Sequence, residues 1–169
     1  NHHSPRMQDV QHFAAARDGG DAGHILVVED NDTGRELLAR KLERDGYCVS
    51  TAGSGENALE MAVTGRFDLV LLDVMMPGID GIEVLRLWHN AGVLERFPVI
   101  VTSAMDEVQS AVRCIELGAD DYLTKPFDPV LLRARIRASI ERKKLRDAER
   151  LRLTAALKGL GEKGQAVGL

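Results

Sequence analysis

Three acidic side chains and one lysine of this 169-residue chain stand at the ends of short apolar segments, namely Glu29, Asp30, Asp73 and Lys125. A single carboxylate in such a place more commonly caps the helix that follows it. Several carboxylates gathered without histidine or cysteine suit a hard divalent cation, and Mg²⁺ above all. A metal ion beside a lysine is also what a phosphoryl group requires, because its charge is spread over three oxygens.

The segments that must position these side chains alternate regularly along the chain. Apolar runs of strand length are followed by segments with apolar residues at helical spacing, and the connections are short. This alternation predicts an α/β fold, a doubly wound five-stranded parallel sheet with helices on both faces. Ligands bind such sheets beyond the carboxyl ends of the strands, where the four side chains stand. The expected strands are residues 24–28, 47–52, 67–72, 98–103 and 121–124, and the expected helices are residues 33–45, 56–63, 82–88 and 108–117, with a last helix from about residue 129.

Three motifs contain these positions, and they read VEDN, LLDVMMPGIDG and GADDYLTKPF in chain order. Their spacing is distinctive, since 43 residues separate Asp30 from Asp73 and 52 separate Asp73 from Lys125. With these motifs in this order, residues 24–141 resemble the receiver domain of two-component response regulators. The resemblance implies the strand order 2-1-3-4-5 for the predicted sheet.

The resemblance also implies a role for each charged residue. Asp73 resembles the phosphoacceptor, a carboxylate nucleophile that takes a phosphoryl group from a phosphohistidine on a partner protein. Glu29, Asp30 and Asp73 resemble the Mg²⁺ carboxylates, with the backbone carbonyl of Met75 as a further ligand. Lys125 resembles the lysine that pairs with the acceptor at rest and with a phosphoryl oxygen after transfer.

A hydroxyl and an aromatic residue resemble the switch of the family. Thr102 and Ser103 are adjacent, but the distance of 30 residues from Asp73 and the alternation of the strand both select Ser103. Tyr122 resembles the aromatic residue whose rotamer reports phosphorylation, although an edge-strand tyrosine can also serve packing alone. The bond between Lys125 and Pro126 resembles one that is usually cis.

Composition and charge limit the remaining classes of function. No apolar run approaches the roughly 18 residues that span a bilayer, and the N-terminus lacks a signal-peptide core, so we expect a cytoplasmic protein without a membrane partner. Residues 24–128 carry 19 acidic and 9 basic side chains, whereas residues 129–169 carry 4 and 11. The basic tail lacks interleaved aromatic residues and a fitting helix-turn-helix, so we expect no direct DNA binding.

The two ends of the chain depart from the family pattern. Residues 1–23 are interpreted as an N-terminal extension or tag remnant, and residues 142–169 as a helical extension that resembles linkers to effector modules. The last helix is expected to end near residue 157, ahead of two glycines. Its exposed stripe fits a parallel homodimer stem, a solvated single helix, or contacts with nucleic acid or acidic lipid. The stripe consists of Leu145, Ala148, Leu151 and Ala155.

Two hypotheses for function follow from these features. The favoured one is a phosphorelay switch that accepts a phosphoryl group from a histidine kinase or phosphotransfer protein, with Mg²⁺ as cofactor. It would catalyse its own phosphorylation at Asp73 and slow dephosphorylation, and it would signal through the face formed by the fourth helix, fifth strand and fifth helix. The alternative is a receiver that is never phosphorylated and acts as a dimerisation or docking module.

Overall fold

The computed structural model describes residues 22–167, with side chains described through residue 161, so the extension predicted over residues 1–23 lies almost wholly outside it. The centre of the fold is a five-stranded sheet in the order β2-β1-β3-β4-β5, and all its neighbouring strands are parallel. The predicted α/β class and strand order are both confirmed. The strands are β1 (His24–Val28), β2 (Cys48–Ala52), β3 (Leu69–Asp73), β4 (Val99–Ala104) and β5 (Asp121–Lys125).

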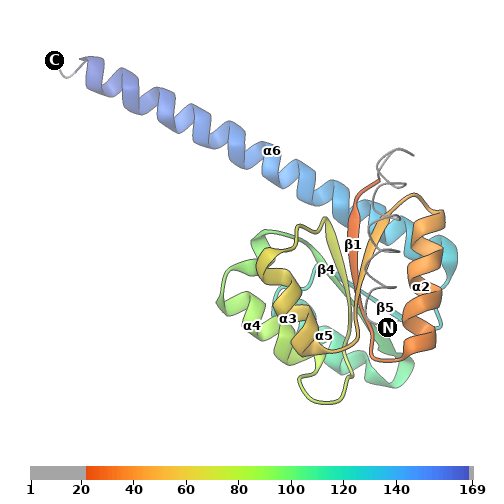
Figure 1. Ribbon diagram of the computed structural model, residues 1–169. Coiled ribbons are helices and arrows are strands. Elements are labelled where there is room, and N and C mark those ends of the chain that lie inside the picture. The colour runs from red at the N-terminus through yellow and green to blue at the C-terminus, as the bar shows by residue number, and fades with distance from the viewer. Residues whose placement is uncertain (1–21, 168–169) are drawn as a thin grey trace.

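Helices cover both faces of the sheet, and each face has its own core (Figure 1). One core lies between the sheet and α3, α4 and α5, and the other lies between the sheet and α2 with the first turns of α6. The central strands are buried on both faces, which explains why their sequences are continuous apolar runs. The helices are α2 (Asp32–Arg44), α3 (Gly55–Thr64), α4 (Gly81–Asn90), α5 (Val108–Glu116) and α6 (Pro129–Val167), with short 3-10 turns at Val93–Glu95 and Met105–Glu107.

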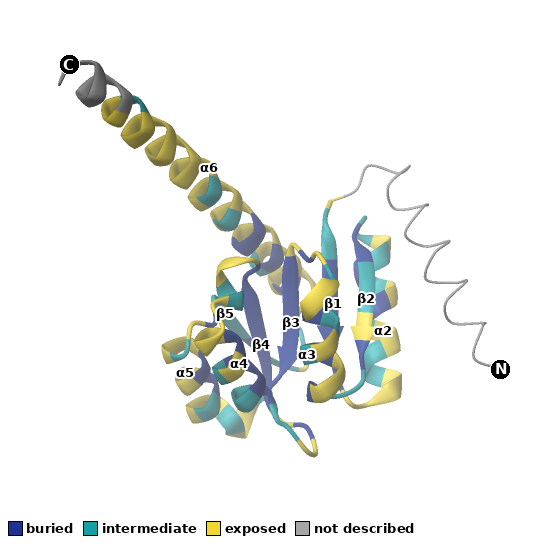
Figure 2. Ribbon diagram, turned by 60° about the vertical axis from the view of Figure 1, so that its left-hand side comes forward, coloured by how far each residue is buried: buried dark blue, intermediate teal, exposed yellow. Residues whose placement is uncertain are grey.

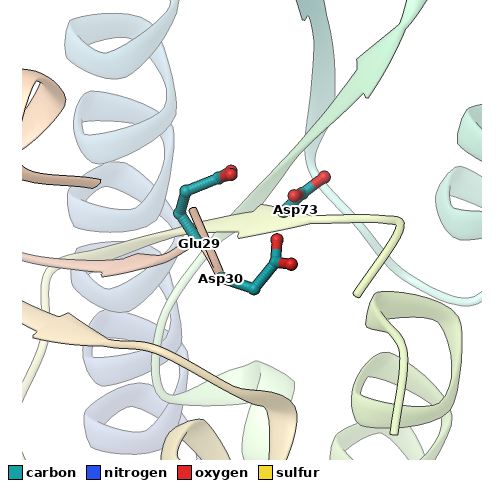
Figure 3. A group of neighbouring side chains, drawn as sticks. All are labelled: Glu29, Asp30 and Asp73. Atoms are coloured by element: carbon teal, nitrogen blue, oxygen red, sulfur yellow. The ribbon is translucent and has the colours of Figure 1, made fainter. Parts of the chain in front are cut away.

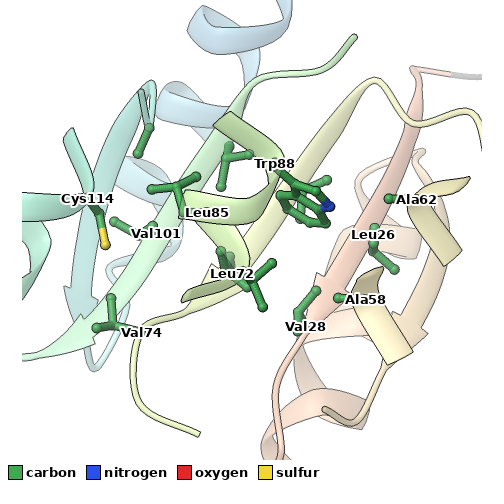
Figure 4. Close-up of a cluster of buried hydrophobic side chains, with 14 of the residues drawn as sticks. Leu26, Val28, Ala58, Ala62, Leu72, Val74, Leu85, Trp88, Val101 and Cys114 are labelled. Atoms are coloured by element: carbon green, nitrogen blue, oxygen red, sulfur yellow. The ribbon is translucent and has the colours of Figure 1, made fainter. Parts of the chain in front are cut away.

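The core on the α3, α4 and α5 face holds the strands in a fixed relation to these helices. Figure 4 shows Leu72 and Val101 of the sheet beside Leu85 and Trp88 of α4. The Trp88 ring stands edge-on to Phe97 with centroids 5.2 Å apart, a favourable aromatic geometry. Helix α4 is therefore packed along β3 and β4 on this side of the sheet.

The start of α4 is fitted tightly against the end of β3. Asp80 caps the helix by accepting a hydrogen bond from the backbone N–H of Glu83 at 2.9 Å. A Cβ atom at Gly81 would lie 2.3 Å from the carbonyl oxygen of Asp73, so only glycine fits there. The turn-rich segment of the second motif thus brings a helix start directly against the strand that ends in Asp73.

The last helix, α6, packs its apolar side chains into the core of the domain only over its first three turns. Leu132, Ile136 and Ile140 are buried against the sheet, whereas the rest of the helix projects away from the domain (Figures 1 and 2). No helix of the described part of the chain is both long and apolar enough to cross a membrane.

The predicted end of α6 near residue 157 is wrong, because the helix continues to Val167. Glycine costs a helix only about 1 kcal/mol relative to alanine, which weakens the helix without ending it. A glycine ends a helix when it adopts a left-handed conformation. Gly159 and Gly161 are not among the glycines with positive φ in the described residues.

Candidate functional site

Three carboxylates meet at the carboxyl ends of β1 and β3. The two strands are hydrogen-bonded neighbours with Val28 paired to Leu72, so the residues that follow them lie side by side. One carboxylate oxygen from each of Glu29, Asp30 and Asp73 lies within 4.8 Å of the others (Figure 3). Asp73 is buried and Asp30 is exposed, so the cluster opens to solvent on one side. The structure thus brings together the three acidic residues that the sequence selected.

Lys125 reaches this cluster from the end of β5. Its Nζ atom donates to Glu29 Oε2 at 2.8 Å and lies 3.3 Å from Asp73 Oδ2. Burial would lower the pKa of Lys125, but the hydrogen bond and charges of Glu29 and Asp73 raise it above its usual range. The lysine is therefore a fixed positive charge between two carboxylates. The acids of the cluster still exceed it by two.

Of the three acids, Asp73 has a clearly raised pKa. Burial and the adjacent Glu29 carboxyl raise the pKa of Asp73 to about 7, against the lowering effect of Lys125. A second positive charge at the cluster would reverse this shift and favour the carboxylate. Clustered oxygen ligands of this kind, one of them open to solvent, fit a divalent cation such as Mg²⁺.

The loop that carries Glu29 is held by a residue that the sequence did not reveal. Arg35, in the first turn of α2, donates from NH1 to the carbonyl oxygen of Glu29 at 2.8 Å and from NH2 to Asp32 at 2.6 Å. Asn31 caps the same helix by accepting from the Gly34 N–H at 2.7 Å. The only indication in the sequence was a basic residue six positions after Glu29. An arginine on the solvent-exposed side of a helix could stand at the same position, so the spacing does not predict this contact.

The loop after Asp73 has a similar support. The Met75 N–H donates to Asp73 Oδ1 at 3.3 Å, which orients the Asp73 carboxylate. Further along, the Ile79 N–H donates to Glu56 Oε1 at 3.3 Å, so the start of α3 holds the loop from outside. Glu56 was also missed, because its partner is 23 residues away in sequence and is a backbone group.

Ser103 has the most unusual environment of the predicted site residues. It is fully buried, and its Oγ atom is the one buried side-chain polar atom of the described residues without a hydrogen-bond partner. Val99 and Val101 on the same side of β4 belong to the core beneath α3, α4 and α5, while Ile100 faces the other core. Ser103 therefore lies on the former side and Thr102 on the opposite one. Tyr122 is half-buried and packs against the same core as Val101.

The bond between Lys125 and Pro126 is cis, as the resemblance implies. Beside it, a cavity of about 570 Å³ opens next to the acidic cluster, between α2 and the loop that follows β5. Leu37 on its rim is 62% exposed. The cavity is lined by Glu29, Asn31, Gly34, Leu37, Leu38, Lys41, Lys125, Pro126 and Phe127.

Residues 25–137 match the family described as the response regulator receiver domain. The chain belongs to this family. It is a phosphorelay switch domain of the two-component type, which confirms the main functional prediction from the sequence. The match includes every residue of the acidic cluster, Ser103 and Lys125.

Characterised relatives of the receiver domain are regulators. The chain is 46% identical over 121 residues to the alkaline phosphatase synthesis transcriptional regulatory protein PhoP of Bacillus subtilis, covering 72% of this chain and 50% of that protein. It is 46% identical over 125 residues to the response regulator MprA of Mycobacterium ulcerans, covering 74% and 53%. The chain thus spans about half the length of these relatives.

Solved structures give the same result for the fold. The receiver domain of the Francisella response regulator 1452 superposes with a TM-score of 0.66 at 32% identity, covering 71% of this chain and 98% of that one. NtrX from Brucella abortus gives a TM-score of 0.70 at 32% identity, covering 77% of this chain and 29% of that one.

Proposed function

We propose that Asp73 is the phosphoacceptor of this receiver domain and that a histidine kinase or phosphotransfer protein supplies the phosphoryl group. The observation that supports this most directly is the buried Asp73 carboxylate, held between Lys125 and two further acids. In the reaction, an Asp73 oxygen attacks phosphorus, an O–P bond forms, and the P–N bond to the donor imidazole breaks. The imidazole nitrogen leaves with the electron pair and takes up a proton.

Glu29, Asp30 and Asp73, with the backbone carbonyl of Met75, would hold Mg²⁺. The ion would neutralise charge on the transferred phosphoryl group and on the acceptor. Lys125 spans Glu29 and Asp73 at rest, and it would exchange part of this ion pair for a phosphoryl oxygen after transfer. The raised pKa of Asp73, about 7, fits a group that requires a cation to act as a carboxylate near neutral pH.

Ser103 and Tyr122 would turn the chemical change into a conformational one. Phosphorylation adds a charge of about −1.5 to −2 and three acceptor oxygens. The Ser103 hydroxyl lacks a partner at rest, so a hydrogen bond to the phosphoryl group would remove its desolvation cost. Inward movement of Ser103 would leave space for the Tyr122 ring. The conformation of the face formed by α5, β5 and α6, which are the fourth helix, fifth strand and fifth helix of the prediction, would then change.

The cavity beside the cluster is the proposed approach for the phosphodonor. Its wall is largely apolar, with Leu37, Leu38 and Phe127 near Lys125. A partner helix or loop placed there would bring its histidine to the open side of the acidic cluster. Such a partner would be a cytoplasmic protein, in keeping with the location predicted from the sequence.

Intact mass spectrometry tests the proposed function. Incubation with Mg²⁺ and acetyl phosphate or phosphoramidate should add about 80 Da to the protein, the mass of one phosphoryl group. Asp73→Asn should remove the gain, because an amide cannot attack phosphorus. Asp68→Asn, at the residue before β3, is the matched control and should keep the gain. A gain that persists in Asp73→Asn and maps away from Glu29 and Asp30 would refute the assignment, and no gain in any variant would favour the docking-module alternative.

We further propose that the receiver domain forms a homodimer through the projecting part of α6. Leu145 and Leu151 are 62% and 72% exposed, which leaves the predicted stripe free for a parallel partner helix. Charge repulsion across the stem is reduced by pairs within the chain, such as Lys143 with Asp147. Since salt screens the remaining repulsion, dimerisation should strengthen as salt rises.

Sedimentation tests the stem. Truncation after residue 142 should lower the dimer fraction while the phosphorylation of Asp73 remains. An unchanged oligomeric state after truncation would contradict the stem and would leave the α5, β5 and α6 face as the dimer interface. The predicted absence of DNA binding is checked by titrating the same protein with duplex DNA.

A further inference from the structure

The end of β5 opposite Lys125 carries a second charged cluster, centred on Asp120. The Asp120 backbone N–H donates to the carbonyl oxygen of Val99 at 2.7 Å, which fixes this residue to the start of β4. Its carboxylate is mostly buried, with 12% of the side chain exposed. The cluster lies at the end of the sheet where α6 leaves the domain (Figure 1).

Successive turns of α6 converge on this one carboxylate. Ser139 Oγ donates to Asp120 Oδ2 at 2.7 Å, and Arg142 NH2 donates to the same oxygen at 2.5 Å. Arg142 also donates to Ser139 Oγ at 3.0 Å, so the three groups are mutually bonded. Arg146, one turn further, lies 3.6 Å from Asp120 Oδ1.

The neighbouring acid extends the contact toward the domain. Arg135 pairs with Asp121 at 2.6 Å and also donates to the carbonyl oxygen of Tyr122 at 3.1 Å. The residues of α6 that face these two acids are 135, 139, 142 and 146, and their spacing of four, three and four places them on one side of the helix. This polar stripe runs beside the apolar stripe of Leu132, Ile136 and Ile140.

Along α6, the polar stripe extends further toward the C-terminus than the apolar stripe does. Ile140 is the last buried hydrophobic side chain of α6 among the described residues, whereas Arg142 and Arg146 reach back to the domain from the next two turns. A hollow of about 230 Å³ separates these turns from the segments before β4 and β5, so apolar packing does not hold them. A helix outside a domain is marginal unless something packs against it or binds it.

Asp120 is charged under ordinary conditions. Burial would raise the pKa of Asp120, but hydrogen bonds from Arg142 and Ser139 and the charge of Arg146 lower it below its usual range. Hydrogen bonds to an ionised carboxylate in a buried place are stronger than those between neutral groups. The Asp120 carboxylate thus accepts two hydrogen bonds, from Ser139 and Arg142, and has the Arg146 guanidinium as a third, more distant partner.

We infer that Asp120 is a clamp that fixes the direction in which α6 leaves the domain and extends the ordered helix by two turns past the core. Together with Asp121 it attaches the projecting helix to β5, the strand that also carries Tyr122 and Lys125. The projecting helix then moves as one body with this strand, and anything bound to it is positioned by the strand. This role does not depend on phosphorylation of Asp73.

A distance measurement by electron spin resonance tests the clamp. Spin labels on Asn90→Cys and Ala156→Cys report the direction of the helix, and Cys48 and Cys114 do not interfere because both are buried. The labelled protein is diluted with unlabelled protein to suppress distances between copies. The otherwise unchanged protein should give one narrow distribution, and Asp120→Asn should widen it about twofold, since the turns past the core lose their attachment.

Three further variants complete the design. Arg142→Gln, on the exposed side of the contact, should widen the distribution equally without touching the core. The double variant should add little, because both changes remove the same interaction. Glu149→Gln removes an acid whose one ion pair among the described residues is with Arg152 on the same helix, so it is the matched control and should change nothing.

Hydrogen exchange gives an independent readout of the same variants. Amides of residues 141–148 should exchange about five- to tenfold faster in Asp120→Asn and in Arg142→Gln, the effect of losing charged hydrogen bonds. An unchanged distance distribution and unchanged exchange in both single variants would overturn the clamp. A full widening in Glu149→Gln would overturn it as well, because general loss of helix charge would then be the cause.

Discussion

Acidic side chains lie near both ends of β5, but the number of positively charged and hydrogen-bonding partners differs between the two ends. At the carboxyl end, three carboxylates share one lysine, and the nearby Ser103 hydroxyl has no partner. At the other end, a single carboxylate, that of Asp120, receives a serine hydroxyl and lies close to two arginines. Burial is substantial at both ends, so the difference lies in how many partners each acid has.

The number of partners distinguishes the cluster proposed to bind a cation and a phosphoryl group from the Asp120 contact proposed to attach α6. At the carboxyl end, burial and the neighbouring Glu29 carboxyl raise the pKa of Asp73 to about 7 despite Lys125, so the cluster would gain from a further cation. At the other end, burial is outweighed by the hydrogen bonds from Arg142 and Ser139 and by the charge of Arg146, which lower the pKa of Asp120 and favour its charged form. Opposite pKa shifts at the two edges of the sheet, for Asp73 at the end of β3 and for Asp120 before β5, thus accompany opposite surroundings.

The largest expected effect is on metal-free stability at high pH. Because the pKa of Asp73 is raised in the folded state, its contribution to stability is complete below about pH 4 and is lost as pH rises through 7. Asp73→Asn should therefore be more stable than the parent by about 4 kcal/mol at pH 8, with little difference at pH 4. Urea unfolding in a chelator at both pH values measures this. Equal pH dependence of the stability of the two proteins would show that the pKa of Asp73 is not raised in the folded state.

Asp120 should show the opposite pH dependence. Its pKa is lowered in the folded state, so its contribution is present above about pH 4 and is lost as pH falls further. Asp120→Asn should cost about 2 kcal/mol at pH 7, the usual size for hydrogen bonds to a charged group, and the cost should shrink in acid. Thermal unfolding from pH 3 to 7 is the measurement, with Glu149→Gln as control. A cost that stays constant down to pH 3 would exclude an ionised Asp120 as its source.

Magnesium affinity is the next test of the comparison. Sites with few protein ligands and several retained waters bind Mg²⁺ weakly, and we expect an affinity in the micromolar to millimolar range. Asp30→Ala should reduce it about tenfold, because one of three carboxylates is lost. Asp120→Asn should leave it unchanged. Calorimetry distinguishes these outcomes, and unchanged binding in Asp30→Ala would contradict the proposed metal site.

The smallest effect concerns the unpaired hydroxyl. Ser103→Ala removes a buried polar group without a partner, so it should stabilise the resting domain by about 0.5–1 kcal/mol. The variant should still accept a phosphoryl group at Asp73. Its hydrogen-exchange response over α5, β5 and the start of α6 should be reduced, since the new hydrogen bond cannot form. A full response in the variant would remove Ser103 from the switch.

The strand ends and their charges could be predicted from the sequence because both depend on local patterns. Apolar runs of five or six residues fixed the strands, and the residue after each run fixed which side chains reach the carboxyl edge. Arg35 and Glu56 could not be found in this way. Each binds a backbone group of a loop, and a backbone partner leaves no trace in the types of the residues that it joins.

The partners of Asp120 and Asp121 are likewise set by the fold and not by local sequence. Asp120 and Asp121 follow Gly118 in a motif, and nothing in the sequence indicates that their partners lie on the last helix. The distance in sequence is 22 residues from Asp120 to Arg142 and 14 from Asp121 to Arg135. Only the antiparallel course of α6 beside β5 brings these groups together.

The sequence by itself determined the fold class, the strand order through its motifs, and the identity of the acidic cluster with Lys125. The fold class and the cluster follow from alternating periodicity and residue type, which act over a few residues, whereas the strand order was implied by the resemblance of the motifs to the receiver family. The tertiary structure decided which charged groups have partners and that the Ser103 hydroxyl lacks one. It also decided that α6 continues past Gly159 and Gly161 and that Arg142 of this helix binds Asp120 where the helix leaves the domain. These properties depend on distances between elements far apart in sequence, which are set only when the helices pack on the sheet.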